Sequence, residues 1–288
     1  MTLWERRRRA FLRNRSAIAG AVLVGVVVAA ALLAGAVARF HPEMRVDPDR
    51  ADIFKLHPSA THPLGTDENG FDVFSRLLFG ARTSLVTAVA SISLALVVGI
   101  PLGAAAGWRG GWVDSLVMRA TDVFLAFPAL LLAVCIAAIR GKHELLTVIY
   151  AVAVVSVPPI VRQVRAAVLQ VKSLEYVTAA RALGVPPSRI VVGTVLPNCI
   201  APIVVLATLG TGSAILDAAG LSFLGLGPPP TAPEWGVMLT HGFQYALDPK
   251  LWFLLIPPGA AIALTVLGFN LLGDGLRDAL DPRTTAGR

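Results

Sequence analysis

Long apolar runs alternate with short polar segments along this chain, and the runs have the length that membrane spans require. A helix needs roughly 20 predominantly apolar residues to cross the hydrocarbon core of a bilayer. The pattern therefore predicts an all-α membrane protein with six transmembrane helices. The six runs cover residues 17–38, 83–108, 123–139, 145–161, 199–216 and 251–273.

The first run has a second interpretation, as a secretory signal peptide. A basic start at Arg6–Arg9 precedes it, and Ala36-Val37-Ala38 resembles a cleavage site of small residues. However, the apolar part of a signal peptide is about 7–15 residues long, and this run is longer. We therefore expect an uncleaved first helix.

The segments between the runs differ in character. The segment 39–82 is rich in proline and glycine, so we expect an extracytoplasmic loop ordered by turns, with Phe71–Phe79 as an amphipathic helix on the membrane surface. Four prolines make Gly225–Pro249 a second outer loop with a short re-entrant part. We divide the chain into 1–82, which holds the first helix and its loop, and 83–288, which holds a five-helix core.

The amino-acid composition supports a membrane protein, and the positions of the Lys and Arg residues indicate its orientation. Only 15% of the 288 residues are charged, against about 25% in soluble domains. The net charge of +7 does not indicate nucleic-acid binding, because the arginines gather at the ends of the apolar runs. With both termini in the cytoplasm, the cytoplasmic segments hold 16 of the 25 Lys and Arg residues, as the positive-inside rule favours. These segments are 1–16, 109–122, 162–198 and 274–288.

The sequence shows no recognisable motif for catalysis or for cofactor binding. The chain has no G-x-x-x-x-G-K-[ST] phosphate loop, so we expect no ATP hydrolysis by this subunit. Cys135 and Cys199 lie in or beside apolar runs and behave as small hydrophobes. The histidines are scattered without metal-ligand spacing, so we assign no catalytic residue, no metal site and no bound cofactor. They are His41, His57, His62, His143 and His241.

Two other classes of membrane protein are disfavoured. An intramembrane enzyme needs clustered Asp, His, Ser or Glu residues at membrane depth, and apart from Asp217 the runs lack them. An ion-coupled secondary transporter usually shows ionisable groups near the midplane and inverted repeats. Neither is visible in this sequence.

The most informative segment is Lys172–Asn198, which we place in the cytoplasm. Ser173 can cap a helix that runs through Leu183, and Gly184 can close that helix in a left-handed conformation. A second helix restarts at Pro186-Pro187-Ser188 and runs through Val195, with Pro197 as a boundary before the fifth span. The segment is therefore predicted to project from the membrane as two short helices joined by a glycine turn.

This segment resembles the cytoplasmic loop of bacterial ABC-importer permeases, which has the pattern E-A-A, three residues, Gly, nine residues, Ile, one residue, Leu-Pro. Thr178 and Thr194 depart from the pattern at the Glu and Ile positions, and the remaining residues match. The resemblance implies that the loop 172–198 inserts a coupling helix into a groove of an ATPase subunit, where Arg181 could pair with an acidic residue. The implied coupling residues are Ala179, Ala180, Arg181, Gly184, Leu196 and Pro197.

Other motifs make the resemblance specific to the C-type subunit of the dipeptide and oligopeptide branch, and it covers nearly the whole chain. They include His62-Pro63-Leu64-Gly65-Thr66-Asp67, Gly80-Ala81-Arg82-Thr83-Ser84-Leu85, Leu221–Gly227, Asn270–Asp274 and Asp281-Pro282-Arg283. The resemblance implies the fold of a type I importer permease, with a second permease subunit, two ATPase domains that bind ATP and Mg²⁺, and an extracytoplasmic peptide-binding protein as partners. Nickel chelates and haem are alternative cargoes in that family.

Within this framework, a translocation pathway is expected at the interface with the second permease. Asp217 is the only charged residue between Cys199 and Pro233, and it is a candidate for a gate or pathway position. The uncharged candidates for a wet pathway are Ser213, Thr208, Thr211 and Ser91. We interpret Glu234-Trp235-Gly236 as a turn, with contact to the binding protein as the alternative.

A stripe of glycines indicates where two helices pack closely. Gly99, Gly103 and Gly107 are spaced four residues apart within the second span. This small-xxx-small spacing lets helix backbones approach. We therefore expect packing inside the bundle at these positions and no contact with substrate.

Overall fold

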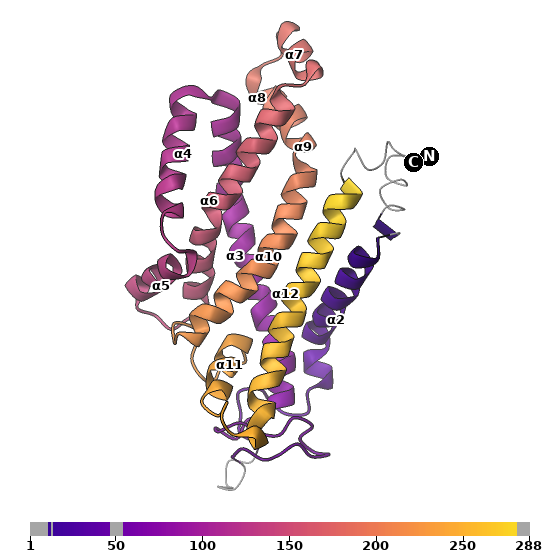
Figure 1. The fold of residues 1–288 in the computed structure, drawn as a ribbon, viewed down its shortest axis with the longest axis vertical. Helices are drawn as coiled ribbons and strands as arrows, with labels where there is room; N and C mark the ends of the chain where they lie inside the picture. The colour runs from indigo at the N-terminus through magenta and orange to yellow at the C-terminus, as the bar shows by residue number, and fades with distance from the viewer. Residues whose placement is uncertain (1–10, 13, 47–53, 281–288) are drawn as a thin grey trace.

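The chain folds as an elongated bundle of long helices (Figure 1). The computed structural model describes residues 11–12, 14–46 and 54–280. The basic residues Arg6–Arg9 and the motif Asp281-Pro282-Arg283 lie outside the described residues. The helices are α2 (Arg15–Val37), α3 (Val73–Arg109), α4 (Gly111–Leu125), α5 (Ala129–Arg140), α6 (Leu145–Lys172), α7 (Glu175–Ala182), α8 (Pro187–Ile190), η2 (Val191–Val195), α9 (Leu196–Asn198), α10 (Ile200–Phe223), α11 (Trp235–Phe243), η3 (Pro249–Leu251) and α12 (Trp252–Leu280).

Five stretches of the described chain are long and apolar enough to cross a membrane, namely α2, α3, α6, α10 and η3 with α12. A sixth span exists if α4 and α5 are counted as one, although the two helices meet at an angle of 89°. The structure therefore agrees with the prediction of an all-helical protein with up to six spans.

The predicted third span, 123–139, is wrong in its limits. A helix already begins at Gly111, in a segment that we assigned to a cytoplasmic loop, and it ends at Leu125. The chain then turns at Phe127-Pro128, and α5 starts after the proline. A proline cannot donate a backbone hydrogen bond and disfavours the helical conformation of the residue before it, which explains a break at this point.

The predicted surface helix Phe71–Phe79 is helical but is not a separate element, because residues from Val73 onwards are the first turns of α3. The Asp72 side chain caps α3 by accepting a hydrogen bond from the Ser75 amide at 2.8 Å. Helix α3 has 37 residues, which corresponds to about 55 Å at the usual rise per residue. A bilayer core is about 30 Å thick, so α3 extends beyond the membrane.

The centre of the bundle is the close pair of α3 and α6. A Cβ atom added to Gly103 would lie 2.7 Å from the carbonyl oxygen of Val161 and 2.8 Å from the Cβ of Val164. Gly99 meets Ile160 and Gly107 meets Val168 in the same way. The prediction that these glycines serve helix packing is confirmed.

Helix α2 lies at the edge of the bundle, beside α12 (Figure 1). The two backbones approach closely at Gly20, where an added Cβ would lie 2.4 Å from the amide nitrogen of Leu272. At the start of α2, the side-chain Nδ2 of Asn14 donates a hydrogen bond to the carboxylate of Asp278 at 2.9 Å. The described start of α2 and the end of α12 therefore lie at the same end of the bundle.

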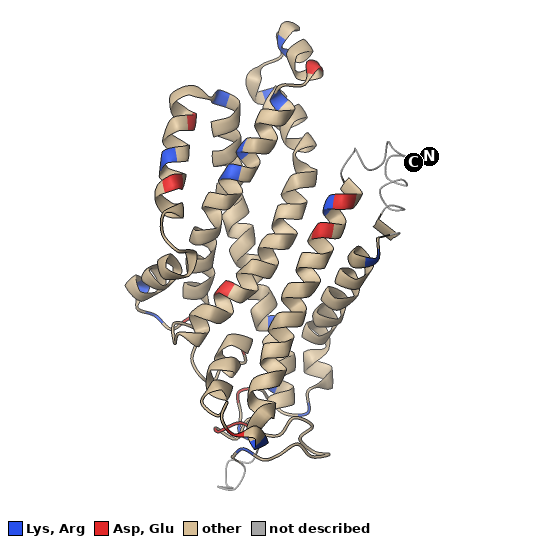
Figure 2. Ribbon diagram, in the orientation of Figure 1, with Lys and Arg blue, Asp and Glu red and all other residues tan. Residues whose placement is uncertain are grey.

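Most charged residues lie towards the two ends of the bundle, and the middle is largely uncharged (Figure 2). One end carries α7 and α8, which project past the neighbouring helices, and the other carries α11 and the loop that precedes α3 (Figure 1). The two ends of the bundle therefore hold most of its charged side chains.

Candidate functional site: the coupling hairpin, the α10 face and the polar cluster

The segment 172–198 forms a hairpin of short helices, which we call the coupling hairpin. Helix α7 ends in a Schellman motif: the Gly184 amide donates to the carbonyl of Arg181 at 3.0 Å, and the Val185 amide donates to the carbonyl of Ala180 at 3.1 Å. Gly184 has φ +75°, so the predicted left-handed glycine is confirmed. An added Cβ would meet no atom within 4 Å, so backbone conformation alone favours glycine here.

The predicted cap of α7 is wrong. The residue before α7 is Leu174, which has no capping side chain, and the Ser173 hydroxyl donates instead to the carbonyl of Gln170 at 2.8 Å. The second helix starts at Pro187 as predicted, but a π-helical turn over Val191–Val195 joins it to α9. Pro197 therefore lies inside a nearly continuous helical path into α10.

The six predicted coupling residues fall into two groups. Ala179, Arg181, Gly184 and Pro197 are exposed on the outer surface of the hairpin. Ala180 and Leu196 are half-buried and pack on an apolar cluster at the base of the hairpin. This cluster includes the fully buried side chains of Val177 and Val195, so the hairpin is anchored to the bundle by its inner face.

The predicted pathway residues do not form one surface. Ser213 is exposed on α10, Asp217 is half-buried one turn further on, and Thr208 is half-buried. Thr211 is buried and donates to the carbonyl of Ala207 at 2.8 Å.

Two of these residues have opposite surroundings. Ser91 is fully buried and donates to the carbonyls of Thr87 and Ile149, which places it between α3 and α6 and away from the surface of the chain. The Asp217 side chain makes no hydrogen bond or ion pair with any described residue. Asp217 and Ser213 are therefore the pathway candidates that one face of α10 presents together.

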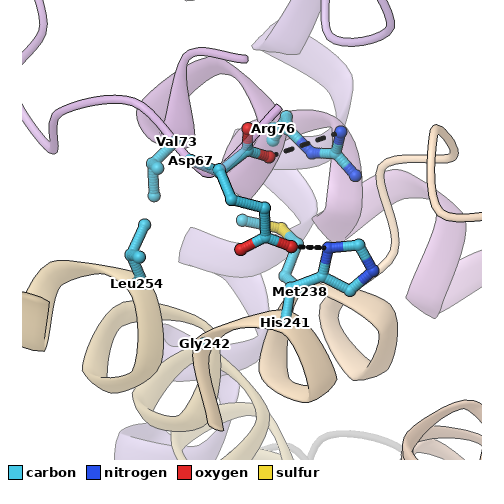
Figure 3. Close-up of a pocket in the computed structure, with 8 residues that line it drawn as sticks. Asp67, Val73, Arg76, Met238, His241, Gly242 and Leu254 are labelled. Atoms are coloured by element: carbon cyan, nitrogen blue, oxygen red, sulfur yellow. Dashed lines mark ion pairs between the residues drawn. The ribbon is translucent and has the colours of Figure 1, made fainter. Parts of the chain in front are cut away.

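At the opposite end of the bundle, ionisable side chains form a cluster that we call the polar cluster: Asp67, Glu68, Arg76 and His241. Glu68 contacts the Nδ1 of His241 at 2.5 Å, and the carboxylate of Asp67 lies 3.7 Å from the guanidinium of Arg76 (Figure 3). Arg76 is only 2% exposed, and it donates to the carbonyls of Pro230 and Ala232. Its guanidinium therefore joins α3 to the loop that precedes α11. Burial raises the pKa of the Asp67 carboxyl, although Arg76 acts in the opposite direction.

Glu234 is a second buried carboxyl at this end of the bundle. Its oxygens accept hydrogen bonds from the amides of Gly236 and Val237 at the start of α11, and from the Ser84 hydroxyl of α3. Burial raises the pKa of Glu234, and these donors lower it by less. Trp235 is also buried and donates to the carbonyl of Leu77 at 3.0 Å. Neither the predicted turn nor the alternative of contact with the binding protein describes Glu234 and Trp235, because both side chains are internal.

Sequence reasoning missed the polar cluster. The only signal was the density of charged and histidine residues in 62–76, which a membrane-flanking loop also shows. Among the described residues, no group of three or more His, Cys, Asp or Glu side chains could hold a metal ion.

Comparison with known proteins gives the family. Residues 99–286 match the family described as "Binding-protein-dependent transport system inner membrane component", and residues 2–58 match the "N-terminal TM domain of oligopeptide transport permease C". The solved structure of the MetNI methionine ABC transporter contains a chain with a TM-score of 0.58 at 22% identity, and the match covers 72% of this chain and 97% of that one. This likeness shows the fold.

Curated relatives match nearly end to end. The chain is 45% identical to the di/tripeptide transport system permease protein DppC of Pseudomonas aeruginosa, over 96% of this chain and 90% of the relative. It is 44% identical to the dipeptide transport system permease protein DppC of Escherichia coli K12, over 95% and 91%. It is also 41% identical to the glutathione transport system permease protein GsiD of Pectobacterium atrosepticum, over 98% and 92%. The chain therefore belongs to the family of inner membrane permease components of binding-protein-dependent transport systems.

Proposed function

We propose that this chain is the C-type permease of an ATP-driven importer that carries di- and oligopeptides across the inner membrane. Membership of the permease family supports the transport role, and the names of the most similar relatives support the peptide cargo. As a permease subunit, the chain leaves ATP and Mg²⁺ to separate ATPase subunits. The partners are a second permease subunit, two ATPase domains and an extracytoplasmic binding protein that delivers the peptide.

The coupling hairpin is the observation that carries this proposal. Its tip stands beyond the bundle and exposes Leu183 at 83%, beside Gly184 and the small side chain of Ala179. An apolar tip with small neighbours fits a groove on another protein, since exposed apolar side chains of this kind mark interaction sites. The hairpin would therefore lie in the cytoplasm against an ATPase subunit, and both chain termini would be cytoplasmic.

The transport mechanism follows from this contact. ATP binding brings the ATPase subunits together, and the coupling hairpin moves with the subunit on which it docks. Packed helices respond to such a shift by changing between discrete arrangements. The bundle would then alternate between outward-facing and inward-facing states.

The pathway would run between this chain and the second permease, along the exposed face of α10. Ser213 and Asp217 supply polar atoms there. An unpaired carboxylate is costly at membrane depth unless it faces water or a partner, so the position of Asp217 supports a wet pathway. The peptide carries an ammonium group, which a carboxylate can attract.

A pull-down tests the coupling site. The tagged chain is purified in mild detergent from its native membrane, as wild type, as Gly184→Arg and as Gly141→Arg. Gly141 has φ +62° and caps the end of α5, shortly before the end of α6 that is remote from the hairpin, so it controls for the strain of an arginine at a left-handed position. We expect the ATPase subunit to be lost with Gly184→Arg alone, while the second permease is recovered with all three chains. Recovery of the ATPase with Gly184→Arg would contradict the docking proposal.

The cargo needs a separate test. Uptake of a radiolabelled dipeptide is measured in cells that express the complete transporter, with unlabelled dipeptide, tripeptide, glutathione, nickel chelate or haem as competitor. We expect competition by the peptides. The relationship to GsiD makes glutathione a second candidate cargo, and inhibition by glutathione alone would replace the general peptide assignment with it. Inhibition only by haem or by a nickel chelate would overturn the peptide assignment.

A further inference from the structure

Three elements meet at Trp108, the penultimate residue of α3. The last residue of α6, Lys172, donates from its ammonium group to the carbonyl of Trp108 at 2.6 Å and to the carbonyl of Gly107 at 3.3 Å. A cation at the carbonyl end of a helix satisfies acceptors that have no partner within the helix. Lys172 thereby fastens the end of α6 to the end of α3, at the base of the coupling hairpin.

Helix α7 of the coupling hairpin contacts the same tryptophan. The guanidinium carbon of Arg181 lies 4.5 Å from the centre of the Trp108 ring, and the ammonium nitrogen of Lys172 lies 5.7 Å from it. The side chain of Arg181 makes no hydrogen bond or ion pair with another described residue. The indole is thus the only partner that orients Arg181 within the described chain. An arginine stacked on an aromatic face also keeps its N–H groups free for other acceptors.

Movement of Trp108 would be passed along the bundle, because α3 cannot move independently of α6 at this end. Gly107 lies so close to α6 that an added Cβ would be 3.0 Å from both the carbonyl oxygen of Arg165 and the Cβ of Val168. Trp108 itself packs on the apolar cluster that anchors the hairpin. A displacement of α7 therefore reaches α3 through this side chain, and it reaches α6 through the short connection after Lys172 and through the apolar cluster.

We propose that Trp108 is a positioning residue for energy coupling: its indole holds Arg181, and through it α7, on the end of the α3–α6 pair, so that movement of the coupling hairpin drives these two helices. The proposal rests on the docking of the hairpin on an ATPase subunit, which is the proposed function above. It assigns the transmission of the movement to a contact within this chain, so docking and transmission can fail separately.

The test measures how much peptide is transported per ATP hydrolysed. The complete transporter is reconstituted in proteoliposomes with the loaded binding protein and a radiolabelled dipeptide, and ATP hydrolysis and uptake are recorded together. Trp108→Leu keeps an apolar side chain and removes the aromatic face. A cation–π contact of this kind corresponds to about a two- to fivefold effect, so we expect transport per ATP to fall by that factor, with the ATPase subunit still recovered in wild-type amount. Trp108→Phe retains a ring and should fall between Trp108→Leu and wild type.

Two further variants keep the test decisive. Trp112→Leu makes the same substitution at a tryptophan that is 76% exposed nearby on α4, and it should leave transport per ATP unchanged. Arg181→Met removes the cation at an exposed position, and in combination with Trp108→Leu it should cause no further loss, because contacting residues are not additive. Unchanged transport per ATP in Trp108→Leu, or losses that multiply in the double variant, would overturn the proposal. Loss of the ATPase subunit from the wild-type complex would instead overturn the docking on which it rests.

Discussion

The buried carboxyl of Glu234 should make stability depend on pH. Its pKa is raised by burial in the folded chain, so the folded state binds a proton more tightly than the unfolded state. The free energy of unfolding must then fall as the pH rises from about 4.3, the ordinary value for glutamate, towards the raised pKa. We expect the thermal unfolding temperature of the purified complex to fall over this range, and Glu234→Gln to remove part of that decrease.

A second variant sharpens the test of Glu234. Ser84 donates a hydrogen bond to the Glu234 carboxylate and so favours its charged form. Ser84→Ala keeps the carboxyl and removes this donor, so the decrease in stability should become larger and continue to higher pH. If the difference in unfolding temperature between wild type and Glu234→Gln were the same at all pH values, Glu234 would not titrate in this range.

Glu234 also marks the limit of prediction at the residue scale. The sequence places it in a proline-rich loop, where a glutamate is normally exposed. Its burial comes from α3, which supplies Ser84 from 150 residues earlier in the chain. By contrast, the left-handed conformation of Gly184 could be predicted, because a glycine that ends a helix is a local signal.

The packing of α3 on α6 gives a prediction at the scale of elements. Alanine at Gly103 would place its Cβ within 2.8 Å of atoms of α6, so we expect Gly103→Ala to destabilise the protein by about 1–3 kcal/mol. Gly25→Ala in α2 meets no atom within 4 Å, and it should be neutral or stabilising by up to about 1 kcal/mol because alanine favours helices. Thermal unfolding in detergent distinguishes the two. Equal unfolding temperatures for Gly103→Ala and Gly25→Ala would mean that α3 and α6 can move apart without a loss of stability.

The prediction of elements succeeded for the spans that are apolar throughout and failed for the helix Gly111–Leu125. Asp114 and Asp122 interrupt the apolar pattern there, in the segment 109–122 that we assigned to the cytoplasm. In the structure, Arg165 on α6 donates two hydrogen bonds to the Asp114 carboxylate at 2.5 and 2.6 Å, and Arg162 pairs with Asp122. A hydropathy pattern cannot reveal that charges far apart in the chain will pair across two helices.

At the scale of the whole molecule, the orientation in the membrane can be tested with two cysteine substitutions. Leu183 at the tip of the coupling hairpin is 83% exposed, and Leu247 at the other end is 99% exposed. In a chain that carries Cys135→Ser and is expressed without the ATPase subunits, a membrane-impermeant maleimide should label Leu247→Cys in intact spheroplasts and Leu183→Cys only after permeabilisation. The chain with Cys135→Ser alone is the control for background labelling. The reverse pattern would invert the orientation and place the hairpin outside the cell.

Much of the whole-molecule arrangement could be predicted because it depends on membrane physics, which acts locally on each run. The runs 17–38, 83–108, 145–161, 199–216 and 251–273 all fall largely within long helices. The pathway could not be predicted in the same way. Of the residues Ser91, Thr208, Thr211 and Ser213, only Ser213 is exposed, and exposure depends on which face of a helix the neighbouring helices cover.

The hydrogen bond from Arg76 to the carbonyl of Pro230 can form only after both residues have been synthesised. The two residues are 154 positions apart, and ribosomes add about 5–20 residues per second, so Arg76 precedes its acceptor by about 8–30 s. Throughout that interval the guanidinium lacks the Pro230 and Ala232 carbonyls, and of the partners described above only Asp67 has been synthesised. The end of the bundle that carries the polar cluster is therefore completed late, and a nascent chain that stops short of Pro230 leaves Arg76 without its two carbonyl acceptors.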